Sequence, residues 1–185
     1  MLIKLSQVLE ELREDHRNIA LLLNLLEAES KHVDGDEEPD FELLHDIMQY
    51  MTVYSDAVHH PREDLVYEAM REHGTELAAG LGGIGPEHRA IAELGSTLRC
   101  DIEAIISGTA VTRERLNADL QGYVALLRRH IAWEEGDLFL RADSMARENG
   151  DASIDMALLK DVDPLFGATT AASFSNLLTH LQKHE

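Results

Sequence analysis

Four long stretches of this chain repeat their apolar residues at intervals of three and four, and this period constrains the fold more than any other feature. Such a repeat is typical of amphipathic helices, each of which buries one face against another element. The alternating pattern expected of strands is absent from the sequence. The four stretches run from about Ser6 to Lys31, Asp40 to His73, Pro86 to Ser107 and Thr112 to Asn149.

Glycine and proline mark the short connections between these stretches. Because short connections place successive helices side by side and antiparallel, we predict an all-α fold, an up-down-up-down four-helix bundle over residues 1–150. Pro61 falls within the second stretch and predicts a bend there. Residues 151–185 are predicted to be a C-terminal helical extension that packs on the bundle. Its apolar residues predict either a cap on the bundle, which we prefer, or a homodimer contact.

Acidic residues dominate the charge of the chain, with 35 Asp and Glu against 16 Lys and Arg and a formal net charge of −19. This charge repels nucleic acids and anionic membranes, so we expect neither as a partner. No stretch approaches the roughly 18 apolar residues needed to cross a bilayer, and the N-terminus lacks the pattern of a signal peptide. The single cysteine, Cys100, excludes an internal disulfide, fits a cytoplasmic location and is expected to be buried.

One histidine in each stretch would lie at the same depth of such a bundle. In an antiparallel hairpin, residues equally far from the turn lie level with each other. His88 and His130 are each about 21 residues from the turn near Thr109, at a rise of about 1.5 Å per residue. His16 and His59 are about 20 and about 23 residues from the preceding turn, a mismatch of a few ångströms. The four imidazoles are therefore expected to meet.

The direction of each side chain around its helix decides whether it faces the interior. At about 100° per residue, His16, His88 and His130 point close to the apolar direction of their own helices. His59 lies at the margin of its apolar face, whereas His60 lies almost opposite that face and is expected to be solvated. We therefore prefer His59, with His60 as the alternative.

Two of the four histidines begin a His-x-x-x-Glu pair. His59 is followed by Glu63, and His130 is followed by Glu134. Residues four apart are neighbours on a helix surface, so each glutamate lies beside its histidine. Glu134 is better directed than Glu135, which is the alternative.

A buried helix face accepts so many polar groups only when they are paired or bind a metal. Imidazole suits iron, zinc, copper and nickel, and a glutamate beside each of two ligating histidines can bridge two ions. The spacing therefore predicts a two-metal centre inside the bundle, with the candidate ligands His16, His59, Glu63, His88, His130 and Glu134.

Four fragments carry a resemblance to a known family: REDHRNI, HHPREDLVYEAM, PEHRAI and RRHIAWEEGDLF. In this order they resemble the hemerythrin-like HHE cation-binding family over roughly residues 10–145. The resemblance implies a four-helix bundle around two non-haem iron ions, with the four histidines as terminal ligands and Glu63 and Glu134 as bridging carboxylates. Zinc and manganese are alternatives, because imidazole and carboxylate bind them too.

The chain departs from the oxygen-carrying members of that family, which have a His-x-x-x-His pair on the third helix. The partner position after His88 is Ala92, which cannot bind a metal. Those proteins also have an acid five residues after the fourth-helix histidine, and that position is Glu135 in this chain. Four histidines and two glutamates are more similar to the set in hemerythrin-like proteins linked to iron-centre repair and nitric-oxide stress. One imidazole fewer leaves more open coordination positions, which favours reactivity over simple storage.

We therefore expect a di-iron protein that handles O₂ or NO in sensing, storage or stress response. A redox or iron-donating enzyme that repairs damaged iron centres is the alternative, and an interaction protein with a vestigial site is the third class. Tyr123 lies two turns before His130 on the same face. It is expected to be a core residue or, as the alternative, to line the metal pocket.

Overall fold

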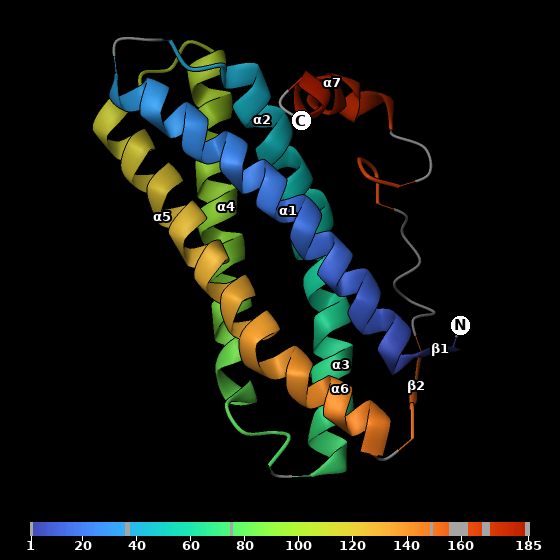
Figure 1. Cartoon of the computed structure of the whole chain (residues 1–185). Coiled ribbons are helices and arrows are strands. Elements are labelled where there is room, and N and C mark those ends of the chain that lie inside the picture. The colour runs from blue at the N-terminus through green and yellow to red at the C-terminus, as the bar shows by residue number, and fades with distance from the viewer. Residues whose placement is uncertain are drawn as a thin grey trace.

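The computed structural model describes residues 2–35, 38–74, 76–148, 150–155, 163–167 and 171–183. These residues are mostly helical, which confirms the all-α prediction (Figure 1). In chain order the elements are β1 (Leu2–Lys4), α1 (Leu5–Asp34), α2 (Phe41–Tyr50), η1 (Met51–His59), α3 (His60–His73), η2 (Leu81–Gly83), α4 (Ile84–Ile106), α5 (Arg113–Trp133), η3 (Glu134–Leu138), α6 (Phe139–Glu148), β2 (Ser153–Asp155), η4 (Ala172–Phe174) and α7 (Ser175–Lys183).

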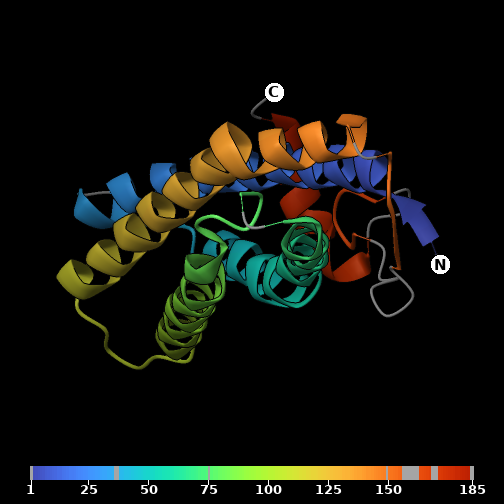
Figure 2. The same ribbon diagram turned by 90° about the horizontal axis from the view of Figure 1, so that it is seen from below.

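The four predicted stretches correspond to four continuous helical segments. The first is α1 and the third is α4. The second consists of α2, η1 and α3 in direct succession, and the fourth of α5, η3 and α6. The helix α1 packs along α5, α4 also packs on α5, and α2 packs on α4. Seen from below, α1 and the α5–α6 segment form one layer, and α3 and α4 form a second (Figure 2).

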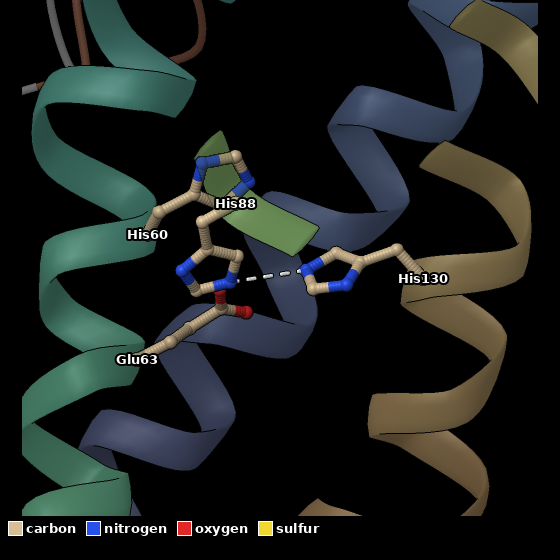
Figure 3. Close-up of side chains that lie close together, drawn as sticks. All are labelled: His60, Glu63, His88 and His130. Atoms are coloured by element: carbon tan, nitrogen blue, oxygen red, sulfur yellow. Dashed lines mark hydrogen bonds and ion pairs between the residues drawn. The ribbon is translucent and has the colours of Figure 1, made fainter. Parts of the chain in front are cut away.

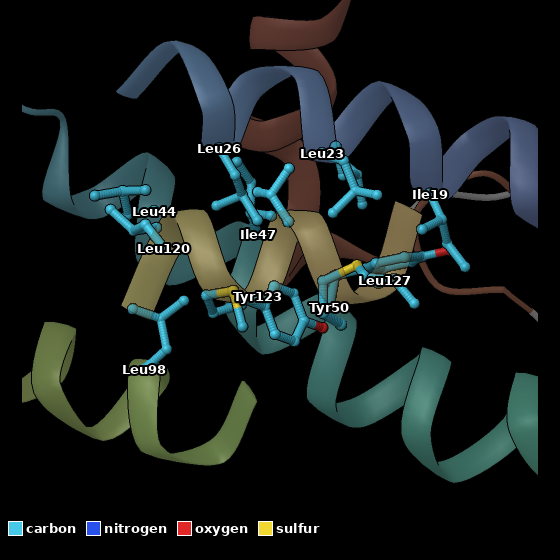
Figure 4. Packing of buried hydrophobic residues seen from close by; sticks show 14 of the residues in the cluster. Ile19, Leu23, Leu26, Leu44, Ile47, Tyr50, Leu98, Leu120, Tyr123 and Leu127 are labelled. Carbon is cyan, nitrogen blue, oxygen red and sulfur yellow. The ribbon is translucent and has the colours of Figure 1, made fainter. Parts of the chain in front are cut away.

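Buried apolar residues form two clusters, separated along the helices. The larger cluster includes Leu23, Tyr50 and Tyr123 (Figure 4), and the smaller one includes Leu9 and Phe139. On α1, the buried apolar residues up to Leu12 belong to the smaller cluster and those from Ile19 onward to the larger one. The other three segments change from one cluster to the other in the same way. The boundary between the clusters is a polar layer, and the predicted ligands lie in it.

Two π-helices interrupt the long segments, and η1 ends and η3 begins at this polar layer. In η1 the backbone N–H of His60 donates to the carbonyl of Ser55, five residues back, and in η3 that of Phe139 donates to Glu134. Pro61 follows in the first turn of α3, and because η1 runs into α3 without a break, its missing N–H removes one backbone hydrogen bond at this junction. The second segment was predicted to bend at Pro61, and the structure has a wider, π-helical turn just before this residue. Single π turns inside α-helices are frequent at functional sites.

A small antiparallel sheet joins the N-terminus to the segment after α6. β1 pairs with β2 in the register Leu2↔Asp155, Ile3↔Ile154 and Lys4↔Ser153. The expectation of no strands was wrong because three residues are too few to show an alternating pattern. The side chain of Cys100 is exposed, which corrects the prediction of a buried thiol. The helical period at position 100 places it on the outer face of α4.

The described part of the C-terminal extension contributes to the larger apolar cluster through Leu165, Phe174 and Leu177. Its helix α7 packs against α2 (Figure 1). In the part of the chain that the structure describes, no helix is both long and apolar enough to cross a membrane.

Candidate metal centre

The six residues predicted as metal ligands lie together in the polar layer, and all four helical segments contribute to it. Each of the six residues has at most 8% of its surface exposed. They are His16 on α1, His59 at the end of η1, Glu63 on α3, His88 on α4, His130 on α5 and Glu134 at the start of η3.

Glu63 lies at the middle of this group. Its Oε1 atom is 3.1 Å from the Nε2 atom of His16 and 3.1 Å from that of His59. Its other carboxylate oxygen, Oε2, is 3.5 Å from the Nε2 atom of His88. A single carboxylate therefore faces imidazoles from three helical segments.

Glu134 faces the same space from the fourth segment. Its Oε2 atom lies 3.3 Å from the Nε2 atom of His130 and 3.5 Å from that of His16. The Tyr67 hydroxyl donates a 2.6 Å hydrogen bond to the other oxygen, Oε1, and the Nε2 atom of His88 is 3.9 Å from that same oxygen. Tyr67 is fully buried, so this hydrogen bond fixes the orientation of the carboxylate.

His60 is a fifth histidine in the layer, and the expectation that it is solvated was wrong. Only 4% of its surface is exposed. Its ring stacks on that of His88, with centroids 4.3 Å apart and planes 15° apart (Figure 3). A regular α-helix advances about 100° per residue, and this period, extended through the whole segment, places His60 on the outer face. The π-helix η1 has an extra residue per hydrogen-bonded turn, so it shifts the faces enough that His59 and His60 both point inward.

Each of the five imidazoles has a carboxylate beside its outer ring nitrogen, Nδ1. A ligating histidine usually holds such a partner, which fixes the ring and leaves Nε2 free for the metal. The Nε2 atoms of the four predicted histidine ligands all face Glu63, Glu134 or each other. Three of these contacts are hydrogen bonds: His16 with Glu135 (2.9 Å), His59 with Asp15 (3.1 Å) and His130 with Glu87 (3.3 Å). The other two are at ion-pair distance without a hydrogen bond: His60 with Asp56 (3.4 Å) and His88 with Asp64 (3.5 Å).

These carboxylates were not predicted as outer partners of the histidines, although a signal for most of them was present in the sequence. Four of them stand directly beside a predicted ligand in the sequence and pair with a histidine on another helical segment. Asp15, for example, precedes His16 on α1 but pairs with His59. Glu135 follows Glu134 but pairs with His16, so it occupies an outer position while Glu134 faces the centre.

The carboxylates determine the charge state of the buried histidines. Burial lowers the pKa of His16, but Glu134, Glu135 and Glu63 raise it more strongly, to about 11. Burial also lowers the pKa of His59, but Glu63 and Asp15 raise it more strongly, to about 9. The pKa of His88 rises to about 10 against the effect of burial. The site therefore stabilises positive charge in its interior, whether that charge is carried by protons or by cations.

The histidines in turn lower the pKa of the two central glutamates, Glu63 and Glu134. Burial would raise the pKa of Glu63, yet His59 and His16 hold it well below the ordinary value for a glutamate. The pKa of Glu134 is also lowered, against burial and the nearby charge of Glu63, by the adjacent imidazoles of His16 and His88. Both carboxylates are thus ionised, which is the form that binds metals.

The donor atoms form two groups, each with the residue types that hold a metal ion. One group of donors, all within 4.8 Å of one another, comes from His16, His59 and Glu63, and a second comes from His60, Glu63, His88 and His130. Glu63 belongs to both groups. Among the described residues, Oε2 of Glu63 and Oε2 of Glu134 are buried without a hydrogen-bond partner. An unpartnered buried carboxylate oxygen is costly unless a cation binds it.

Tyr123 lies in the larger apolar cluster and is fully buried. Its hydroxyl has no hydrogen-bond partner within the described ranges. The tyrosine thus packs as a core residue, the first of the two predicted roles.

Comparison with known proteins gives one match. The model of the hemerythrin HHE cation-binding domain family matches residues 7–142, a range that contains all five buried histidines and their carboxylate partners. No curated protein and no solved structure matches the chain.

Proposed function

Because the chain belongs to the hemerythrin HHE cation-binding domain family, we propose that it binds two iron ions in its polar layer and handles a small diatomic gas, O₂ or NO. The observation that carries this proposal is the position of Glu63, whose carboxylate is shared by two groups of buried donors. A carboxylate with two oxygens and imidazoles on either side is suited to bridge two cations.

We assign the terminal positions to His16, His59, His88 and His130, and the bridging positions to Glu63 and Glu134. When bound, iron would supply redox chemistry toward the gas. The protein's part is to orient the donors: outer carboxylates hold His16, His59 and His130 by hydrogen bonds at their Nδ1 atoms, and Asp64 lies 3.5 Å from that of His88. Tyr67 holds Glu134 in the same way. The apolar clusters on both sides exclude water from the site.

We assign His60 to the support of His88. An ion bound by an imidazole lies in the plane of its ring, and the His60 and His88 planes are nearly parallel and stacked. With the rings stacked in this way, a single ion cannot lie in the plane of both, so His60 and His88 cannot bind the same ion. His60 instead packs on a ligand and pairs its own Nδ1 with Asp56.

The helical segments would form the up-down-up-down four-helix bundle expected from the sequence, with its boundary to the extension near residue 150. A cytoplasmic location, no nucleic-acid partner and a homodimer through the extension remain predictions.

A redox or iron-donating role in the repair of iron centres is the second proposal. It is favoured by Ala92, which stands one turn after His88 and offers no donor, so the six assigned ligands leave open positions at two ions. Ligand exchange and iron release both need open positions.

Metal analysis of the purified full-length chain tests the first proposal. Protein produced with iron should contain about two iron ions per chain, and His130→Ala should contain fewer. The control is His73→Ala, because His73 is exposed at the end of α3. One stoichiometric zinc ion, or no metal after aerobic purification, would contradict the proposal. Release of iron to a metal-free acceptor protein, with no binding of O₂ or NO, would favour the repair role.

A further inference from the structure

The C-terminal extension lies outside the range matched by the family and contacts the helical segment that carries His59. After β2, its described residues resume with the turn 163–167. The Asp163 carboxylate accepts hydrogen bonds from the backbone N–H groups of Leu165 and Phe166, both 2.8 Å, which fixes the turn. Its other oxygen accepts a 2.9 Å hydrogen bond from the hydroxyl of Tyr50, the last residue of α2.

Tyr50 is held by the extension on several sides. The rings of Phe166 and Phe174 each meet the Tyr50 ring edge to face, with centroids 5.9 Å apart. Tyr50 is fully buried. Pairs of aromatic rings in this geometry contribute about 0.5–1.5 kcal/mol beyond their burial. The extension therefore contacts the junction of α2 and η1 through one hydrogen bond and two aromatic rings.

A second set of contacts leads from Tyr50 to the metal centre. The ring of Tyr50 packs on that of Tyr54, one turn later in η1, at 5.3 Å. The Tyr54 hydroxyl donates to both oxygens of Asp15, at 3.3 and 3.4 Å. Asp15 accepts from the Nδ1 atom of His59 at 3.1 Å, and the Nε2 atom of His59 faces Glu63. Four contacts thus join the extension to a predicted ligand.

We propose that Tyr54 is a positioning residue of the metal centre and that the C-terminal extension keeps it in place. Tyr54 orients Asp15, Asp15 orients the His59 ring, and Asp163 with the two phenylalanines anchors Tyr50 against Tyr54. This inference rests on the proposed function, because it assigns to His59 a metal ligand's role. By this proposal, the extension, which lies outside the family-matched residues 7–142, helps the protein to retain its metal.

The test compares Tyr54→Phe and Asp163→Ala with the wild-type full chain. Iron-loaded protein is mixed with excess chelator, and the release of each ion is followed. One of the two ions should leave up to about 10-fold faster from Tyr54→Phe, the low end of the roughly 10–100-fold effect of losing an outer partner outright, because Asp15 itself remains beside His59. Asp163→Ala should also release that ion faster than the wild type does. Asp163→Asn should restore slow release, since its carbonyl still holds the turn and its amide can donate to Tyr50.

Tyr123→Phe is the matched control. It removes the same atom from another buried tyrosine, one whose hydroxyl has no hydrogen-bond partner in the described part of the chain. It should release both ions at the wild-type rate. Equal acceleration of both ions in Tyr54→Phe and in Tyr123→Phe would indicate general loosening and overturn the proposal.

A measurement on metal-free protein separates this inference from the proposed function. Solvent exchange of the His59 Nδ1 proton, followed by NMR, should be faster in Tyr54→Phe and Asp163→Ala than in the wild type. Unchanged exchange in either variant contradicts the positioning chain, whether or not metal binds. Absence of metal in the wild-type protein contradicts the proposed function instead.

Discussion

Glu63→Gln is the substitution that the centre should tolerate least. The change keeps the size of the side chain and removes its charge. In the wild type this carboxylate lies 3.1 Å from the Nε2 atoms of both His16 and His59 and belongs to both groups of metal donors. We therefore expect the variant to lose both ions, whereas His130→Ala keeps one of the two donor groups intact.

The metal-free variant should also be less stable, by an amount that depends on pH. Removing one partner of a buried charge pair costs about 3–5 kcal/mol. The pKa of His59 is raised to about 9 and that of His16 to about 11, so their pairing with Glu63 stabilises the fold fully below about pH 6.5. This contribution is lost as the pH rises through those values. The difference between wild type and variant should therefore be largest near pH 6 and shrink by pH 10.

Urea unfolding of both metal-free proteins at pH 6 and at pH 10 measures this difference. Glu68→Gln is the control, since Glu68 is an exposed glutamate on α3 that pairs with Arg71. Exposed pairs contribute about 0–1 kcal/mol. A Glu63→Gln protein that still binds two ions, or whose loss of stability is the same at both pH values, would refute the reasoning.

Three further results are expected. Tyr67→Phe should destabilise the metal-free protein by about 1.5–3 kcal/mol in urea unfolding, because the hydrogen bond to the buried Glu134 carboxylate is lost; a change below about 0.5 kcal/mol contradicts this. Metal loading at pH 7 should release about three protons per chain, because metals bind neutral imidazole and three of the histidines have raised pKa values. Calorimetry in two buffers of different protonation enthalpy counts them, and a count of zero refutes the charge assignment. His60→Ala should keep two ions with about 10–100-fold weaker affinity, and a metal content of one ion per chain would instead make His60 a ligand.

The helical segments could be predicted because each extends over many turns, so that the apolar period is sampled repeatedly. The depth of the four histidines was predictable for the same reason: it depends on the rise per residue and on the positions of the turns. The pair of short strands was not predictable, since β1 and β2 are stabilised by each other, across about 150 residues of chain, and not by a local pattern.

The direction of side chains was harder to predict than their depth. A regular helix turns His60 away from the interior, and only the π-helix before it brings it inward. A local change in helix type depends on packing around Pro61 and on the tertiary contacts of η1. The same limit applies to Tyr54 and Asp15, whose hydrogen bond joins two helices and carries no signature within either one.

Anomalous diffraction at the iron absorption edge, on crystals of iron-loaded protein, tests the central claim most directly. We predict two peaks in the polar layer, with Glu63 between them, His16 and His59 beside one peak, and His88 and His130 beside the other. A single peak, or peaks at surface carboxylates away from these imidazoles, would contradict the account.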